Sequence, residues 1–441
     1  MKPRGVRRED PPPTLAAFAS ADLLMVPVES RSVGRTSVMR LDPPSPPPRV
    51  AVLTPEGRGA ISVVRVWGPR ALEVADSAFR PVRGERLART DPGRPRVGRM
   101  GVGLGDEVVA VVVEGDPPEV EIQCHGGPSP VALVVEALVA AGAERRQPVA
   151  WIRHVARSRI AAEAEVDLAR APTVRSAEVL LDQSQGALEA DARRLIALAR
   201  DDPSATLDEV EALLRRARVG LRLVSGWRVV LAGRPNVGKS RLLNALAGFN
   251  RALVDPTPGT TRDVVAVRTA FDGWPVELAD TAGLRTSEDA IEATGIARAR
   301  TRQAEADLVV VVLDRSEPLT HADREVIEAF SGGLIVANKA DLPPSWEPWA
   351  PQVLSISAQR GDGIEALAAA VAHRLVPEPQ PPGAGVPFRS AHVRWLYEAR
   401  GALNAGAVDA ATRRLSEFLA HLPDPSRAHH GHRSEGEDDS D

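Results

Sequence analysis

Cysteine is almost absent from this sequence of 441 residues, in which Cys124 is the only one. A single cysteine excludes an internal disulfide and a zinc cluster built on several cysteines. The sequence also has no apolar run long enough to cross a membrane, and the basic start MKPRGVRRED is not followed by an apolar segment of signal-peptide length. We therefore expect a cytoplasmic protein in a reducing environment, without contact to a membrane.

An excess of charge of one sign is also missing, because 55 Lys and Arg residues stand against 59 Asp and Glu residues. This balance argues against a generally basic nucleic-acid-binding protein, but it leaves a local basic patch open. Hydrophobic residues make up 43% of the chain and charged residues 26%, which is typical of a globular protein. The length favours two or three domains.

The two ends of the chain have compositions that oppose folding. Residues 1–48 are rich in Pro, Arg and Ser, and residues 423–441 form a polar tail with the acidic ending EGEDDSD. We expect both to be disordered. Residues 49–147 contain β-branched runs such as AISVVRVWG and DEVVAVVVEG, followed by the helical pattern VALVVEALVAAGA at 131–143. They predict a small α+β domain.

Two segments with helical spacing flank a region that alternates strands and helices. Residues 148–222 and 377–422 place apolar side chains at helical intervals, and Ser204 or Thr206 is expected to cap the helix that contains TLDEVEALLRR. Between them, residues 223–376 alternate strand and helix patterns, as a mostly parallel sheet requires. The sequence thus predicts an α/β domain inserted in an α-helical domain, after the small α+β domain.

A phosphate-binding loop stands out at residues 233–240. GRPNVGKS fits G-x-x-x-x-G-K-S and lies between the apolar strand WRVVLAG and the helical segment SRLLNALAG. Glycines let backbone N–H groups approach phosphate, and the start of a helix favours an anion. We expect Lys239 to reach the β- and γ-phosphates and Ser240 to hold Mg²⁺. The nucleotide contacts predicted here are Asn236, Val237, Gly238, Lys239, Ser240 and Arg241.

Two further motifs follow the loop in the order found in GTPases. Asp280 begins DTAG after the strand WPVELA, where it can reach the Mg²⁺ shell through water while the Gly283 N–H meets the γ-phosphate. Thr261 in GTTRD can close over Mg²⁺ when the triphosphate is bound. The alternative for GTTRD is a polar turn before the strand VVAVRTAF.

The motif NKAD at 338–341 indicates guanine as the base. The Asp341 carboxylate can accept hydrogen bonds from the guanine N1–H and 2-amino groups, a pair that adenine does not offer. By analogy with other bidentate base contacts, this discriminates by about 1–3 kcal/mol. Asn338 and Lys339 would brace the loops and stack along the base, and Ser357 and Ala358 of SAQ would contact its edge. Together these motifs predict a P-loop GTPase that hydrolyses GTP to GDP and phosphate.

The segments GRPNVGKSRLLNALAG, PGTTRDVV and DTAGLRTSEDAIEATGIARAR closely resemble the tRNA modification GTPase family (MnmE/TrmE). Residues 54–75 and 119–127, with EVEIQCHGG, resemble its N-terminal folate-binding domain, so the resemblance covers about residues 50–415. It implies a folate (5-formyltetrahydrofolate), potassium beside the nucleotide and a homodimer formed through the G domains. It also implies a flavoprotein partner, with which the family modifies the wobble uridine of tRNA.

The resemblance assigns roles to single residues. Asn236 matches the P-loop asparagine that helps to bind K⁺, and Glu292 matches the glutamate that orients the attacking water. Position 284, directly after DTAG, is a leucine that cannot orient water, so another group must do so. The alternative for Glu292 is a solvated helix residue. Arg65 or Glu121 would line the folate pocket.

The chain departs from the family pattern at several places. EGDPP replaces the family's S-Y-T-G-E stretch at 114–118, VDPTP at 254–258 is atypical, and the C-terminal Cys-containing motif has no counterpart. GTP hydrolysis is therefore the stronger expectation and uridine modification the weaker. The alternative is a regulatory GTPase switch, for example in ribosome assembly. Cys124 and the neighbouring His125 lack further metal ligands, so we expect them to pack or to form a turn.

Overall fold

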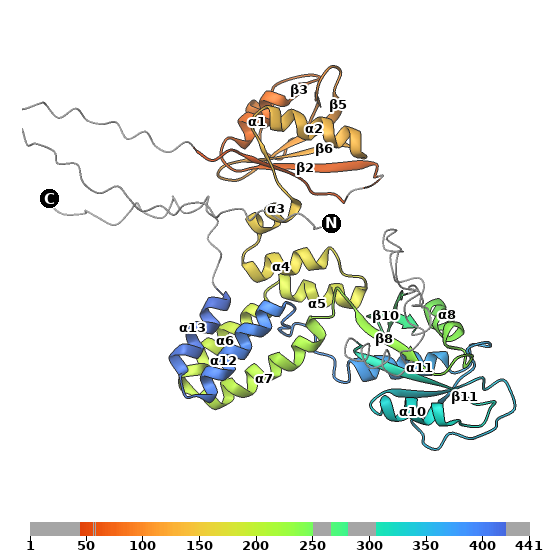
Figure 1. Ribbon diagram of the computed structural model, residues 1–441. Coiled ribbons are helices and arrows are strands. Elements are labelled where there is room, and N and C mark those ends of the chain that lie inside the picture. Colours follow the sequence, from red (N-terminus) through yellow and green to blue (C-terminus); the bar gives the residue numbers. More distant parts are fainter. Residues whose placement is uncertain (1–44, 56, 58, 250–265, 281–305, 420–441) are drawn as a thin grey trace, which may run out of the picture. The chain divides into compact units, whose positions relative to one another are not determined.

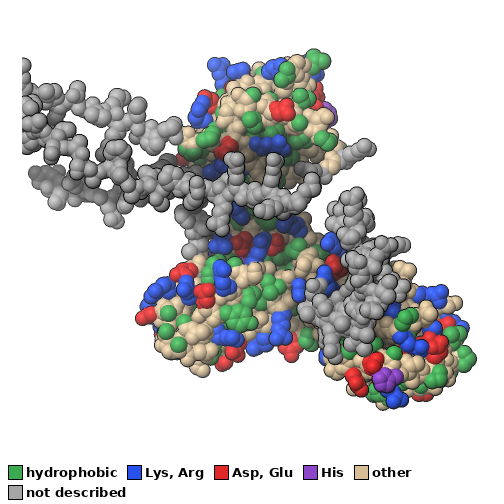
Figure 2. Space-filling view, viewed as in Figure 1, with side chains coloured by type: hydrophobic (Ala, Val, Ile, Leu, Met, Phe, Trp, Pro, Cys, Tyr) green, Lys and Arg blue, Asp and Glu red, His purple; other side chains and the backbone are tan. Residues whose placement is uncertain are grey.

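The computed structural model describes residues 45–55, 57, 59–249, 266–280 and 306–419 (Figure 1). Most of the two expected disordered ends therefore lies outside the described residues. None of the helices described is long and apolar enough to cross a membrane. In the view of Figure 2, basic and acidic side chains are mixed over the described surface, in line with the balanced composition.

The N-terminal region is a sheet covered by two helices. Its seven described strands have the order β3-β4-β5-β6-β2-β1-β7 and pair antiparallel except β1 with β7. Alternate residues of β5 face the core beside the helices, so burial alternates along a strand whose sequence is almost uniformly apolar. The predicted α+β character is confirmed. The elements are β1 (Arg49–Val52), β2 (Ile61–Trp67), α1 (Ala71–Ala78), β3 (Arg80–Pro81), a 3₁₀ turn (Leu87–Arg89), β4 (Arg96–Met100), β5 (Asp106–Val113), β6 (Glu119–His125), α2 (Pro128–Ala140) and β7 (Glu144–Arg145).

The helical region is assembled from two stretches of chain. Helices α12 and α13 pack against α7 and α6, which come before the inserted α/β region in sequence (Figure 1). Their apolar faces share one core, which includes Leu195, Leu213, Leu396 and Leu415. The predicted insertion of an α/β domain into a helical one is therefore confirmed. The helices are α3 (Pro148–Val155), α4 (Arg159–Leu168), α5 (Val174–Ser184), α6 (Ala187–Asp201), α7 (Pro203–Gly220), α12 (Ser390–Asn404) and α13 (Val408–Leu419).

The predicted cap of α7 is wrong. Asp202 caps the helix, because its carboxylate accepts a hydrogen bond of 2.9 Å from the N–H of Ala205. Pro203 occupies the first helical position, where its missing N–H costs nothing and its fixed φ fits the helix. Ser204 and Thr206 lie inside the first turn, and the Thr206 hydroxyl donates to the Asp202 carbonyl oxygen.

A partly buried polar cluster joins α4 to α12. The Glu163 carboxylate lies 2.9 Å from His392 Nε2 and accepts a hydrogen bond of 2.9 Å from Arg159 Nε. Burial alone would raise the pKa of Glu163, but the hydrogen bonds from His392 and Arg159 outweigh it and lower this pKa to about 2. The glutamate is thus ionised and ties the first part of the helical region to the part that returns.

The third region is a sheet with helices on both faces. Its six described strands have the order β13-β12-β11-β8-β10-β9, all parallel except β9, which pairs antiparallel with β10. Alternate residues of the fully buried strand β11 enter the cores on opposite faces. The predicted mostly parallel sheet is confirmed. The elements are β8 (Trp227–Ala232), α8 (Lys239–Phe249), β9 (Ala266–Phe271), β10 (Trp274–Asp280), β11 (Leu308–Asp314), α10 (His321–Ala329), β12 (Leu334–Asn338), β13 (Leu354–Ser355) and α11 (Ile364–Leu375).

Candidate nucleotide-binding site

The phosphate-binding loop connects β8 to α8 at the carboxyl edge of the parallel strands, where α/β sheets bind ligands. Gly233 and Gly238 have φ of 149° and 96°, a conformation that side chains disfavour. A Cβ atom at Gly233 would meet the Val312 carbonyl oxygen, and one at Gly238 would meet the Asn338 amide. Asn236 also has a positive φ, 67°, at the exposed tip of the loop. The backbone therefore approaches its surroundings too closely for other residues at both glycines.

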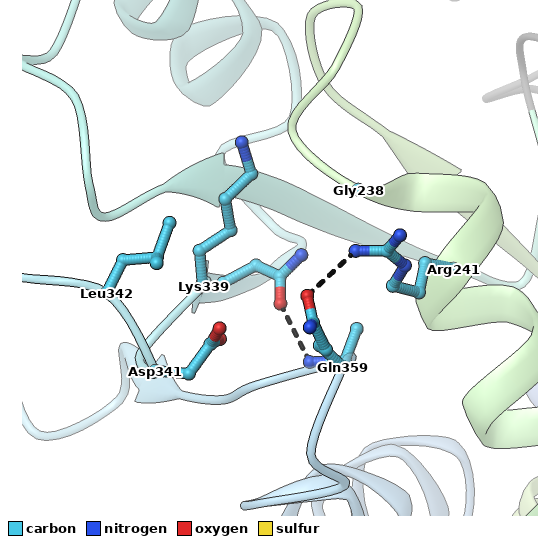
Figure 3. A pocket seen from close by; sticks show the side chains of 8 residues that line it. Gly238, Arg241, Lys339, Asp341, Leu342 and Gln359 are labelled. Atoms are coloured by element: carbon cyan, nitrogen blue, oxygen red, sulfur yellow. Dashed lines mark hydrogen bonds between the residues drawn. The ribbon is translucent and has the colours of Figure 1, made fainter.

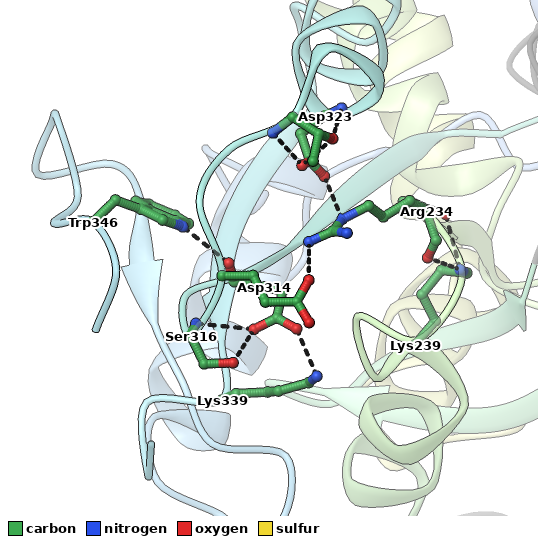
Figure 4. Close-up of polar contacts among 10 residues, drawn as sticks. Arg234, Lys239, Asp314, Ser316, Asp323, Lys339 and Trp346 are labelled. Carbon is green, nitrogen blue, oxygen red and sulfur yellow. Dashed lines mark hydrogen bonds and ion pairs between the residues drawn. The ribbon is translucent and has the colours of Figure 1, made fainter. Parts of the chain in front are cut away.

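Lys239 lies under this loop. Its ammonium group donates hydrogen bonds of 2.8 Å to the carbonyl oxygens of Gly233 and Arg234, and the residue is buried (Figure 4). The cation is thereby held inside the curve of the loop, next to the backbone that is to receive phosphate. Ser240 follows in the first turn of α8 and is exposed.

Asn338 joins the phosphate-binding loop to the SAQ segment. Its amide Nδ2 donates to the Val237 carbonyl oxygen at 2.8 Å, and its Oδ1 accepts from the Ala358 N–H at 3.0 Å. Only 2% of Asn338 is exposed, so both bonds are shielded from water. The structure thus brings Asn338 to both loops that it was expected to brace.

Lys339 is held by the end of the neighbouring strand. Its ammonium lies 2.5 Å from an Asp314 carboxylate oxygen, which belongs to the last residue of β11 (Figure 4). Burial would raise the pKa of Asp314, but hydrogen bonds from Lys339 and Ser316 outweigh it and leave the pKa below its ordinary value. The Lys339 stem is therefore fixed along the wall of the pocket.

These loops surround a pocket of about 200 Å³, smaller than most whole-ligand sites and suited to one part of a ligand. The Asp341 carboxylate accepts a hydrogen bond of 2.6 Å from the Ser357 hydroxyl, which holds the pKa of Asp341 below its ordinary value. An ionised carboxylate only accepts hydrogen bonds, as recognition of guanine requires. The lining residues are Gly238, Arg241, Asn338, Lys339, Asp341, Leu342, Ala358 and Gln359 (Figure 3).

Sequence reasoning assigned no contact to three residues of this neighbourhood, Leu342, Asp314 and Arg234. Leu342 lines the pocket and directly follows Asp341, which was the available signal, and Gln359 of the predicted SAQ segment lines it as well. The signal for Asp314 was its position at the end of a buried strand. Arg234 belongs to the predicted phosphate-binding loop, but no local pattern marked its side-chain contacts, because they lie far along the chain.

Three predicted site residues, Thr261, Gly283 and Glu292, lie outside the described residues. Asp280 ends β10 and pairs with Leu231 of β8, so its backbone reaches the sheet edge from which the phosphate-binding loop starts. Where the structure describes the chain, no group of three or more His, Cys, Asp or Glu could hold a metal ion. Mg²⁺ usually combines few protein oxygens with phosphate oxygens, and the exposed Ser240 hydroxyl beside the loop fits that arrangement.

The candidate residues of the N-terminal sheet are engaged in local contacts or buried. Arg65 makes an ion pair of 2.9 Å with Glu121 and lies over the Trp151 ring. Cys124 is buried, and burial raises the pKa of its thiol to about 11, which suits a packed residue and opposes a nucleophile. His125 is exposed, and its ring lies 2.7 Å from an Asp106 carboxylate oxygen.

A parallel sheet whose phosphate-binding, NKAD and SAQ loops meet at one pocket defines a guanine-nucleotide-binding P-loop GTPase. Two family profiles match the chain: "50S ribosome-binding GTPase" over residues 228–339 and "GTP-binding protein TrmE N-terminus" over residues 49–149.

The chain is 40% identical to the tRNA modification GTPase MnmE of Symbiobacterium thermophilum, over 73% of this chain and 81% of that protein. It is 35% identical to MnmE of Bacillus subtilis, over 67% of this chain and 73% of that protein. Among solved structures, the G domain of the T. maritima FeoB iron transporter is 27% identical, with a TM-score of 0.26, over 34% of this chain and 97% of that one.

The chain belongs to the MnmE family of tRNA modification GTPases. It is an enzyme that binds GTP and GDP and hydrolyses GTP with Mg²⁺.

Proposed function

We propose that this GTPase acts in the modification of the wobble uridine of tRNA. The observation that carries the proposal is the relationship to MnmE proteins, which extends over the N-terminal sheet as well as the nucleotide-binding region. Because these relatives are tRNA modification GTPases, the alternative of a regulatory switch in ribosome assembly is not favoured. The test is analysis of wobble uridines in a deletion strain, where loss of the modification is expected and its full retention would refute the proposal.

In the proposed site, Asp341 reads guanine while Asn338 and Lys339 hold the loops around the base. Backbone N–H groups from Asn236 to Ser240 receive the phosphates, and Lys239 neutralises their charge. Asp280 reaches the Mg²⁺ shell through water, the Gly283 N–H meets the γ-phosphate, and Ser357 and Ala358 complete the base pocket with Arg241. Support comes from the bonds that join Asn338 to Val237 and Ala358, because they assemble phosphate and base contacts into one unit.

For hydrolysis, a water molecule attacks the γ-phosphorus in line with the bond to the β–γ bridging oxygen. That bond breaks, GDP leaves, and the proton of the water passes to the phosphate. Mg²⁺, held by Ser240 and Thr261, supplies charge neutralisation when bound. We assign the orientation of the water to Glu292 and a K⁺ contact to Asn236, whose exposed position at the loop tip leaves it open to an ion.

The test compares GTP turnover in KCl and NaCl for the wild type, Glu292→Ala and the matched control Glu288→Ala. Faster turnover in KCl and a loss of activity confined to Glu292→Ala are expected. Equal rates in the two salts would rule out the potassium assignment. An active Glu292→Ala enzyme would rule out the role of the glutamate.

The remaining proposals concern organisation and partners. We propose a division into an N-terminal domain, a helical domain in two parts and a G domain, at 49–147, 148–222 with 377–422, and 223–376. Each has a hydrophobic cluster of its own, and Trp227, Trp274 and Val376 at the border of the G domain join the helical cluster. We assign a folate (5-formyltetrahydrofolate), a homodimer, a flavoprotein partner, tRNA and a cytoplasmic location by membership of the family. Sedimentation with GTP in KCl tests the dimer, and a monomer under those conditions would refute it.

A further inference from the structure

Arg234 belongs to the phosphate-binding loop, but its side chain turns toward α10. Its Nη2 donates a hydrogen bond of 2.7 Å to Glu317, in the segment between β11 and α10. Its Nε lies 3.2 Å from a carboxylate oxygen of Asp323, in the first turn of α10 (Figure 4). The guanidinium is thus engaged by two carboxylates that do not belong to the predicted nucleotide contacts.

Asp323 is a rigid partner for this arginine. Only 2% of it is exposed, and its other carboxylate oxygen accepts hydrogen bonds of 2.9 and 2.6 Å from the backbone N–H and the hydroxyl of Thr320. Thr320 and Asp323 form the capping box of α10, which fixes the start of that helix. An arginine bound to this carboxylate is therefore tied to a helix terminus that is itself immobilised.

The backbone of Arg234 is engaged from the other side. Its carbonyl oxygen accepts a hydrogen bond of 2.8 Å from Lys239, the lysine expected to reach the β- and γ-phosphates. One residue thus connects the capping box of α10 to the phosphate-binding lysine. Asp314, the last residue of β11, binds Lys339, and Glu317 in the segment that follows binds Arg234, so this stretch of chain contacts both the base half and the phosphate half of the site.

We propose that Arg234 is a positioning residue for GTP binding and hydrolysis, which anchors the first half of the phosphate-binding loop to Asp323 and Glu317. The anchor holds the Arg234 carbonyl oxygen in the position from which this oxygen orients Lys239. Because the anchored loop is already ordered, it loses less conformational entropy when phosphate binds. This inference rests on the proposed nucleotide site, and Arg234 itself need not touch the nucleotide.

The experiment measures GDP release, GTP turnover and thermal unfolding for Arg234→Ala, Glu317→Gln and a control, Arg315→Ala. Arg315 is a close match, since it pairs with Glu347 at 2.6 Å and is 17% exposed against 21% for Arg234. Arg234→Ala should release GDP about tenfold faster, as expected for loss of one charge-assisted hydrogen bond, and should also lower kcat. Glu317→Gln should act in the same direction more weakly, and the double variant should equal Arg234→Ala.

Each other outcome is decisive. If Arg234→Ala and Arg315→Ala lower the unfolding temperature alike and neither changes GDP release, the arginine is only structural and the inference is wrong. If Arg234→Ala accelerates release but Glu317→Gln does not, Arg234 contacts the nucleotide directly and the positioning role is wrong. Should Arg234→Ala not fold, Glu317→Gln against Arg315→Ala decides the question. A wild type that binds no GDP would overturn the proposed function itself.

Discussion

Replacing Asn338 with alanine is the sharpest perturbation of the site. The change removes a donor to the Val237 carbonyl oxygen and an acceptor for the Ala358 N–H while leaving the chain around them intact. Because Asn338 is only 2% exposed, water does not readily replace either partner. The phosphate-binding loop and the SAQ segment would then be joined only through the rest of the domain, and nucleotide would have to order them on binding.

The size of the effect follows from the two bonds. A neutral hydrogen bond contributes about 0.5–1.5 kcal/mol net, so the pair contributes about 1–3 kcal/mol. If the whole loss appears in nucleotide binding, the affinity for GDP falls about 5- to 150-fold. Any part of this energy that already stabilises the nucleotide-free protein lowers its free energy of unfolding instead when it is lost.

The assay is titration of a fluorescent GDP analogue with Mg²⁺, together with thermal unfolding of the same samples. Ser345→Ala is the control, because it removes one exposed hydrogen bond of 2.8 Å to the Ser316 carbonyl oxygen away from the pocket. An Asn338→Ala variant that binds GDP as tightly as Ser345→Ala would refute the bridging role of this side chain.

Three further predictions concern single groups. Asp341→Asn should weaken the binding of GTP by about 1–3 kcal/mol and favour the binding of XTP, since an amide cannot accept both guanine hydrogen bonds. Competition binding measures this change, and unchanged selectivity would contradict the role of Asp341 in reading the base. The pKa of Glu163 is lowered from 4.5 to about 2, so the free energy of unfolding should fall as the pH drops between these values. In Glu163→Gln this pH dependence should be weaker, as acid titration followed by circular dichroism would measure. Cys124, its pKa raised from 9.0 to about 11, should react with a thiol reagent at pH 8 about a hundredfold more slowly than a free thiol, and rapid labelling of native protein would argue against its burial.

Local patterns sufficed to predict the elements and most of the pocket. Local patterns of a few residues predict the strand β11, the glycine loop and the NKAD motif. The sequence alone therefore predicts that Lys239, Asn338 and Asp341 lie at one edge of the sheet. The insertion of one domain in another was also readable, because helical periodicity resumes after the last strand. The predicted cap of α7 is wrong because serine and threonine are common caps and were chosen for that reason. Pro203 at the first helical position indicates that the preceding residue, Asp202, is the cap.

Contacts distant along the chain could not be predicted in this way. Glu163 meets His392, and Arg234 meets Glu317 and Asp323, only because the fold brings them together. No periodicity or motif records such a pairing, since each partner alone looks like an ordinary surface charge. Their pKa shifts and positioning roles therefore follow from the tertiary structure alone.

The nesting of the nucleotide-binding region within the helical one constrains biosynthesis. A nascent chain emerges from the ribosome N-terminus first, so Leu195 and Leu213 appear long before Leu396 and Leu415, which complete their core. Trp227, at the start of β8, and Val376, just after α11, belong to that same core, so folding of the intervening region brings the separated helices together and reduces the entropy of closure. A defect in the inserted region would leave the earlier helices with an uncovered apolar face, the kind of surface that recruits chaperones or aggregates.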